Sequence, residues 1–303
     1  MSRERQVMTS ATLIDRKALS VAVFFGFLSA LIWGAWPVLS RFGVQKTLSP
    51  YDIAALRFMV AGLILLPFVL KKGTGMLGLP KTLVLTVGQG IPHVLLGILG
   101  LAYAPAGHAG VLIPSAMIAV STIGGWFFLR DRPEKAALIG IFIIMVGATL
   151  SGWQSMSESG GQAWLGDLLF IAAGALWGIY TIASRAWDVD AFQATALVSV
   201  ISMLLYLPLY FIWGTPGILS APVSEIVFQS LFQGVFAAIL ALLFYTKAVT
   251  VLGATRGSIF GGLVPCIASV LAIFVLSEVP SLIEVAGMVL ASGGMIYIFG
   301  FRK

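Results

Sequence analysis

The sequence predicts an all-α membrane protein: ten transmembrane helices, arranged as two inverted five-helix repeats around a central cavity, with both termini cytoplasmic. Three observations predict it: an apolar composition, ten apolar runs of spanning length and an internal duplication. Of the 303 residues, 59% are hydrophobic and only 10% are charged. That is more apolar surface than a water-soluble domain of this size can bury, so the surrounding solvent is expected to be lipid.

The ten apolar runs are each close to the 20 residues that a helix needs to cross about 30 Å of hydrocarbon. Lipid cannot satisfy exposed backbone groups, and the runs lack the alternation of strands, so we expect helices throughout. The predicted helices cover 18–41, 51–70, 82–103, 107–129, 135–153, 164–185, 191–213, 224–247, 256–277 and 281–301.

Lysine and arginine residues concentrate in alternate connections, which predicts the orientation. One side would hold most of the basic residues, namely Arg3, Arg5, Arg16, Lys17, Lys71, Lys72, Lys81, Arg130, Arg132, Lys135, Arg185, Lys247, Arg256, Arg302 and Lys303. The other side would hold only Arg41 and Lys46. By the positive-inside rule both termini are cytoplasmic, and 1–17 is a cytoplasmic segment rather than part of a cleaved signal peptide. Because the positive charges are spread over many loops, we expect no nucleic-acid partner.

A duplication relates the two halves of the chain. Residues 31–41, LIWGAWPVLSR, return at 175–185 as ALWGIYTIASR, at an offset of 144 positions. A second echo matches 131–147, which opens with Asp-Arg-Pro and has glycines at 140 and 147, with 278–294, which opens with Glu-Val-Pro and has glycines at the matching positions 287 and 294. The chain is therefore predicted to contain two copies of one unit.

The two repeats are expected to cover 18–153 and 164–301. Five crossings per repeat is an odd number, so the second repeat would begin on the opposite side of the membrane from the first. This is the inverted-repeat arrangement of secondary transporters, in which the binding site lies near the midplane between the halves.

These motifs also carry a resemblance. WGAWPVLSR in the first helix, AALRFMVAGLILLP in the second, the turn at 103–107 and the paired endings LRDRP and LSEVP resemble the EamA family of the drug/metabolite transporter superfamily. Within that family the chain is similar to bacterial aromatic amino acid exporters. The resemblance implies a multi-pass carrier in the bacterial inner membrane that exports small metabolites; we expect a monomer. One departure is that Pro265 precedes Glu278 by 13 positions, whereas Pro114 precedes Asp131 by 17.

Two aromatic stripes follow from helical spacing. The first contains Trp33, Trp36, Pro37 and Ser40, and the second contains Trp177, Tyr180, Thr181 and Ser184. One interpretation is that Trp33, Trp36, Trp177 and Tyr180 form an aromatic wall that binds flat or apolar substrates. The alternative is that the Trp-Gly pairs are packing features, with Gly34 and Gly178 admitting a neighbouring helix.

Polar residues at mid-depth supply further candidates for substrate binding, since such side chains are costly in a bilayer and usually face a cavity or a partner. Gln89 and His93 share a face of the third helix, and Gln233 lies on the eighth. As an imidazole, His93 could hydrogen-bond an amino acid or carry a proton. The alternative is a histidine satisfied by a hydroxyl or carbonyl group of a neighbouring helix.

Prolines inside the predicted helices are candidate hinges, because proline removes a backbone donor and bends a helix. They are Pro37, Pro92, Pro114 and Pro265. The alternative is a set of static kinks that fit the bundle.

The remaining charged residues have simpler expected roles. Arg57 is predicted to extend towards the membrane surface, with direct substrate binding as the alternative. Asp52, Asp167 and Glu284 stand near predicted helix starts, where the helix dipole favours a carboxylate. His108 is expected to be solvated in an outer turn.

Several absences narrow the function. Small multidrug carriers of the superfamily that this chain resembles have a glutamate within the membrane on the first helix, which serves both cation and proton. The first helix here contains no acidic residue, so the resemblance disfavours a carrier of cationic drugs driven by proton exchange. The chain also has no phosphate-binding loop. With two His and one Cys we expect no metal site and no cofactor. The partners would be a small-molecule substrate and the lipid bilayer. The sequence therefore predicts an alternating-access exporter of apolar or aromatic amino acids and no enzyme; other small neutral or zwitterionic metabolites, drugs and a channel remain open alternatives.

Overall fold

A computed structural model describes residues 16–153, 161–213, 217–253, 256–257 and 259–300. Over these residues every regular element is a helix, and nine helical segments are long and apolar enough to cross a membrane, with a shorter tenth at Leu282–Ile298. Residues 1–15 of the predicted cytoplasmic segment, and the basic residues at its start and at the C-terminus, lie outside this part of the chain.

The helices begin and end within a few residues of the predicted bounds. In the first half they are α2 (Arg16–Val44), α3 (Pro50–Lys72), α4 (Gly78–Gln89), α5 (Ile91–Tyr103), α6 (Ala106–Leu129) and α7 (Lys135–Trp153). In the second half they are α9 (Ala163–Ala186), α10 (Ala191–Trp213), α11 (Val223–Gln229), η3 (Ser230–Leu240), α12 (Ala241–Leu252), α14 (Val264–Leu276) and α15 (Leu282–Gly300), with the short turn η4 (Ile259–Leu263) before α14.

Asp52 has the role at a helix start that its position predicts, and a further one. Ser49 and Asp52 form a reciprocal capping box at the N-terminus of α3. The buried Asp52 carboxylate also accepts hydrogen bonds from the Tyr210 hydroxyl and from the Gly217 backbone N–H at 3.0 Å. The cap of α3 therefore also holds the end of α10.

The third predicted span is interrupted, so the prediction of one continuous helix over 82–103 is wrong in this detail. It consists of α4 and α5, which meet at Gly90. Pro92 lies in the first turn of α5, where its missing N–H has no helical partner to lose. Pro265 likewise occupies the first turn of α14, whereas Pro37 and Pro114 lie inside α2 and α6.

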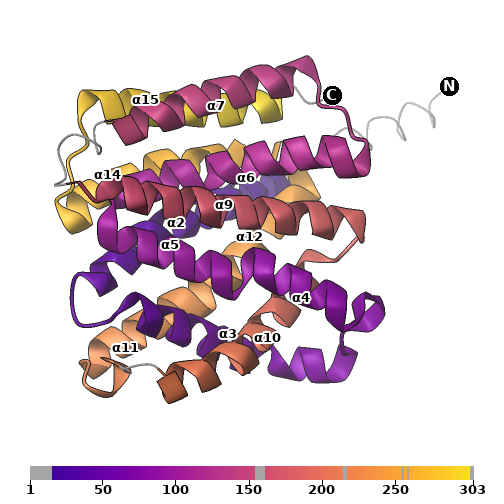
Figure 1. The fold of residues 1–303 in the computed structure, drawn as a ribbon. Helices are drawn as coiled ribbons and strands as arrows, with labels where there is room; N and C mark the ends of the chain where they lie inside the picture. Colours follow the sequence, from indigo (N-terminus) through magenta and orange to yellow (C-terminus); the bar gives the residue numbers. More distant parts are fainter. Residues whose placement is uncertain (1–15, 154–160, 214–216, 254–255, 258, 301–303) are drawn as a thin grey trace.

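The packing of the two halves follows one pattern (Figure 1). Helix α2 packs against α12 and α14, and its counterpart α9 packs against α5 and α6. Gly34 and Gly178 sit at these contacts: an added Cβ would lie 2.6 Å from Ile267 Cγ2 and 2.8 Å from Val120 Cβ, respectively. The packing interpretation of the two Trp-Gly pairs is therefore correct for their glycines.

Helices α7 and α15 lie side by side at one edge of the bundle and make its most extensive helix contact (Figure 1). A Cβ at Gly147 would lie 2.5 Å from Gly287 O, and one at Gly294 would lie 2.8 Å from Gly140 O. The early glycine of each helix thus meets the late glycine of the other. The two helices, which occupy matching places in the duplicated sequence, run antiparallel.

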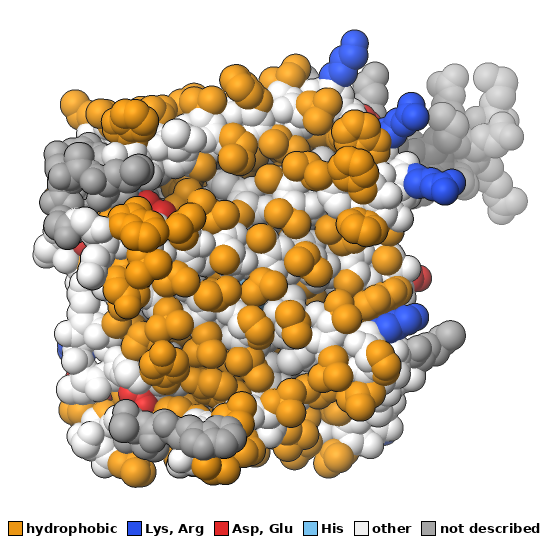
Figure 2. All heavy atoms as spheres, in the orientation of Figure 1, with side chains coloured by type: hydrophobic (Ala, Val, Ile, Leu, Met, Phe, Trp, Pro, Cys, Tyr) orange, Lys and Arg blue, Asp and Glu red, His pale blue; other side chains and the backbone are white. Residues whose placement is uncertain are grey.

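The exposed surface matches a lipid environment. Figure 2 shows apolar side chains across the middle of this face, while most of the visible lysine and arginine side chains gather at one end of the bundle. Large apolar residues such as Phe128, Phe142 and Phe274 are between 69% and 80% exposed. An apolar exterior of this extent is stable in hydrocarbon and not in water.

Candidate functional site

A cavity of about 410 Å³ lies among helices of both halves. Its volume falls in the range of pockets that hold small molecules. Five of the seven predicted substrate-binding residues line it: Trp33, Trp36, Gln89, His93 and Trp177. Most of the remaining lining is apolar, and it includes Pro37 and Pro114.

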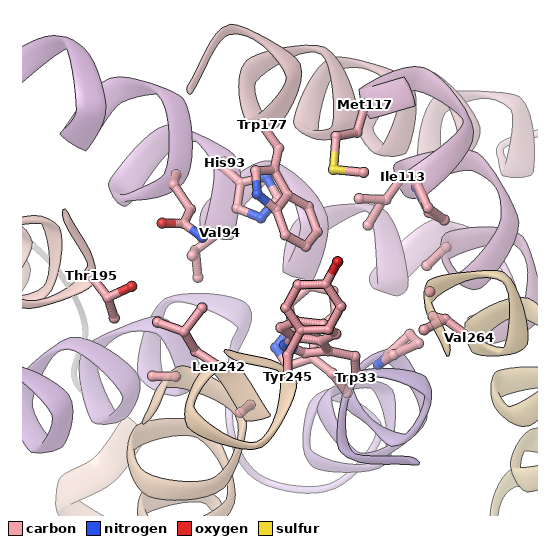
Figure 3. A pocket seen from close by; sticks show the side chains of 18 of the residues that line it. Trp33, His93, Val94, Ile113, Met117, Trp177, Thr195, Leu242, Tyr245 and Val264 are labelled. Atoms are coloured by element: carbon pink, nitrogen blue, oxygen red, sulfur yellow. The ribbon is translucent and has the colours of Figure 1, made fainter. Parts of the chain in front are cut away.

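Two ring pairs face one another across the cavity (Figure 3). Trp33 of α2 packs against Tyr245 of α12, with ring centroids 5.4 Å apart, and Trp177 of α9 packs against His93 of α5 at 5.3 Å. The hydroxyl of Tyr245 points into the space between the pairs. A flat apolar group placed there would meet aromatic faces from both halves of the chain.

His93 combines the two interpretations that its sequence position left open. It lines the cavity, and its Nδ1 lies 2.8 Å from the carbonyl oxygen of Ala173. A carbonyl can only accept a hydrogen bond, so Nδ1 carries the proton and Nε2 of the neutral ring is an acceptor. The bond to Ala173 also fixes the ring beside Trp177.

Gln233 supports the cavity wall from behind. It is fully buried; its Oε1 accepts a 3.0 Å hydrogen bond from Trp36 Nε1, and its Nε2 donates to Ser40 Oγ at 2.9 Å and to Gln229 Oε1 at 3.1 Å. Trp36 thus has its polar N–H satisfied by the protein, and its ring is held against the cavity. The structure places Gln233 beside the cavity rather than in its lining.

The other predicted residues also lie outside the lining. Tyr180 packs on the backbone of α4, where a Cβ at Gly88 would be 2.7 Å from Tyr180 Cβ, and its neighbour Thr181 lines the cavity instead. Pro92 and Pro265 do not line it either.

Four polar residues of the lining were not predicted to face the cavity. Tyr245, Thr195 and Ser199 were not singled out, and Arg57 was expected to extend to the membrane surface. The structure turns Arg57 into the cavity, which corrects that expectation. A signal was present in the sequence, because Thr195 and Ser199 lie four positions apart on one face of a mostly apolar helix.

A second cavity of about 380 Å³ continues from the first towards one end of the bundle. It shares Met117, Ile118 and Thr181 with the first cavity and reaches Asp131 and Arg185. Those two residues form an ion pair, Arg185 Nη2 to Asp131 Oδ2 at 2.6 Å, and their side chains are 47% and 45% exposed.

A matching ion pair lies in a different part of the molecule. Arg41, the duplicate of Arg185, pairs with Glu278, the duplicate of Asp131, and these side chains are only 17% and 19% exposed. Arg41 also donates to the carbonyl oxygens of Leu101 and Ala104, and Glu278 Oε2 accepts from the Ala106 N–H at 2.9 Å. Neither cavity is lined by Arg41 or Glu278.

The expectation that His108 is solvated is wrong. His108 is buried, with Nδ1 2.9 Å from Asp167 Oδ1 and Nε2 3.0 Å from Glu284 Oε1. The two carboxylates expected only at helix starts therefore also tie α9 and α15 to α6. A histidine between two acidic residues is stable in a buried place because both ring nitrogens have partners.

A family model decides the identification. The model of the EamA-like transporter family matches residues 20–153 and again 164–300. This chain belongs to the EamA-like transporter family. It is a multi-pass membrane protein, and the resemblance seen in its motifs is correct at the level of the family.

Relatives of this EamA-like chain have names that call them transporters and state no substrate. It is 25% identical over 297 residues to the uncharacterized transporter YetK of Bacillus subtilis, covering 95% of this chain and 89% of that protein. It is 24% identical over 279 residues to an uncharacterized transporter of Archaeoglobus fulgidus, covering 88% and 93%. A solved crystal structure shares the fold, with a TM-score of 0.62, 19% identity and coverage of 92% of this chain and 96% of the other.

Proposed function

We propose that this EamA-like protein is a secondary transporter, working as a monomer, that exports small metabolites across the cytoplasmic membrane by alternating access. The substrates proposed are amino acids with apolar or aromatic side chains. The observation that carries the proposal is a cavity lined by both halves together with two duplicated ion pairs, of which one is mostly buried and the other borders a second cavity.

The duplicated packing supports an inverted relation between the halves. Helices α7 and α15 are equivalent in the duplicated sequence and pack antiparallel through Gly140, Gly147, Gly287 and Gly294. Two units related by an axis in the membrane plane would make such a contact. The basic residues favour a cytoplasmic location for the Asp131–Arg185 end, so the state described here would face the cytoplasm.

In the proposed mechanism the Arg41–Glu278 end and the Arg185–Asp131 end take turns at being closed. Substrate would enter from the cytoplasm through the second cavity and bind between the ring pairs. Burial of the Arg185–Asp131 pair, which is already formed but exposed, with release of Arg41 from Glu278 would then open the opposite side. Pro37 and Pro114 lie inside helices that line the cavity and are the proposed hinges, with Pro92 and Pro265 at helix starts as secondary ones.

Counterflow in proteoliposomes tests this function. Liposomes that contain the purified protein and are loaded with unlabelled phenylalanine should show saturable uptake of labelled phenylalanine. The same assay with a pH gradient reports proton coupling. Trp36→Ala and His93→Ala should each lower the flux about tenfold while the protein remains folded. Flux that does not saturate and shows no counterflow would indicate a channel instead, and unchanged flux in both variants would contradict the cavity assignment.

A further inference from the structure

Among the described residues that line the cavity, one carries a full positive charge and none carries a negative charge. Arg57 is a guanidinium in its lining, and no aspartate or glutamate is among the lining residues. In the part of the chain that the structure describes, the carboxylates that pair with basic groups do so elsewhere, with Arg41, His108 and Arg185. Arg57 forms no hydrogen bond or ion pair with any described residue.

An unpaired guanidinium is costly at this depth. Arg57 lies seven residues beyond Pro50, the first residue of α3, or about 10 Å along the helix axis at the usual rise. A charged residue well inside a membrane span costs a few kcal/mol unless water or a partner compensates it. Its place in the cavity therefore indicates a ligand that supplies negative charge.

Neutral polar groups accompany Arg57. Gln89 at the end of α4 and Thr195 and Ser199 on α10 line the same cavity. Helix α10 packs against both α3 and α4, so these side chains come from three adjoining helices. Like that of Arg57, their side chains form no hydrogen bond with another described residue, which leaves their hydrogen-bonding capacity for a ligand.

The aromatic groups come from other helices. Trp33, Trp177 and Tyr245 belong to α2, α9 and α12 and gather around the space that Figure 3 shows. The cavity thus combines a set of polar groups from α3, α4 and α10 with an aromatic set. A molecule with a small charged head and a flat or apolar tail would satisfy both sets at once.

We infer that Arg57 binds the carboxylate of the transported molecule, with Gln89, Thr195 and Ser199 contacting the rest of its head group. This inference rests on the proposed transport function and names the substrate group that the cavity binds, a carboxylate. A guanidinium suits this role because its planar fork donates two parallel hydrogen bonds to a carboxylate. Cationic amines without a carboxylate would be excluded, because the cavity has no acidic group to pair with them.

Ligand-induced thermal stabilisation of the purified protein tests the inference directly, since a ligand of the folded state raises its melting temperature. The probes are four molecules with one aromatic tail and different heads: phenylalanine, phenylacetate, phenylalaninamide and phenethylamine. We expect the two carboxylates to bind at least about tenfold more tightly than the amide and the amine. Arg57→Gln should remove that preference, and Arg57→Lys should retain part of it as a point charge.

Lys71→Gln is the matched control, because it removes one positive charge from the exposed end of the same helix and should leave the preference unchanged. Equal binding of the amide and phenylalanine to the unaltered protein would overturn the inference, whether or not Arg57→Gln folds. Failure of all four probes to bind would overturn it as well. Carboxylate-selective binding without counterflow would uphold Arg57 and contradict transport, whereas counterflow without head-group preference would do the reverse.

Discussion

The two ends of this transporter are built from duplicated residues but differ in burial. At one end Arg41 and Glu278 are less than one-fifth exposed and are tied to Leu101, Ala104 and Ala106. At the other, Arg185 and Asp131 are nearly half exposed and border a cavity. Equivalent residues in unequal surroundings are what a carrier captured in one of two alternating states would contain, because each end must be able to adopt both arrangements.

The largest effect is expected from Glu278→Ala at the buried end. The substitution leaves Arg41 without its carboxylate and the Ala106 N–H without its acceptor. Removing one partner of a partly buried ion pair costs about 3 kcal/mol, which corresponds to a shift of more than a hundredfold between states. Counterflow should fall at least tenfold, and amide hydrogen exchange over 101–108 should accelerate. Unchanged exchange in this segment would show that the pair does not hold this end closed.

The next largest difference between the two ends is expected when the charges within each ion pair are exchanged. Arg185→Asp combined with Asp131→Arg should recover most of the activity that either single substitution loses, because the exposed pair can form with its charges reversed. Arg41→Glu combined with Glu278→Arg should recover little, because a carboxylate at 41 cannot donate to the Leu101 and Ala104 carbonyls. Counterflow rates of the four single and two double variants measure this. Equal recovery at both ends would mean that the extra hydrogen bonds at the buried end do not matter.

The smallest effect is expected from Asp131→Asn. Ion pairs as exposed as Asp131 and Arg185 contribute about 0.2–1 kcal/mol, so the stability of the described state, followed by its melting temperature, should fall by less than about 1 kcal/mol. Raising the ionic strength to 1 M should change the stability of the unaltered protein in the same direction as Asp131→Asn does, since salt screens exposed charges. A loss as large as that of Glu278→Ala would refute the difference between the ends.

The spans could be predicted because lipid leaves few options for an apolar chain. Composition and run length located the helices to within a few residues, and the glycine echo of 140–147 and 287–294 proved to be one helix contact. The break at Gly90 could not be predicted, because Pro92 fits a helix start as well as it fits a kink. Whether a proline begins a helix or bends one depends on the residues around it.

The site was harder to predict than the spans. Gln233 was placed on the cavity face from ordinary helical spacing, but it lies in a π-helical stretch, whose wider turn changes which residues share a face. Tyr180 occupies the position in the second repeat that matches Trp36 in the first. It nevertheless faces α4, because Gly88 leaves room for it there. Arg57 was misjudged because extension to the surface is the common solution for a charge near a helix end.

Spin-label distances across both ends test the central proposal, alternation around one cavity, most directly. With Cys266 replaced by serine, labels at Lys46→Cys and Val279→Cys report on the Arg41–Glu278 end, and labels at Glu134→Cys and Ala186→Cys report on the Arg185–Asp131 end. With phenylalanine inside and outside the liposomes, the label distance at the Arg41–Glu278 end should gain a longer population. The label distance at the Arg185–Asp131 end should gain a shorter one. Lengthening at both ends together, or no change at either, would contradict alternating access.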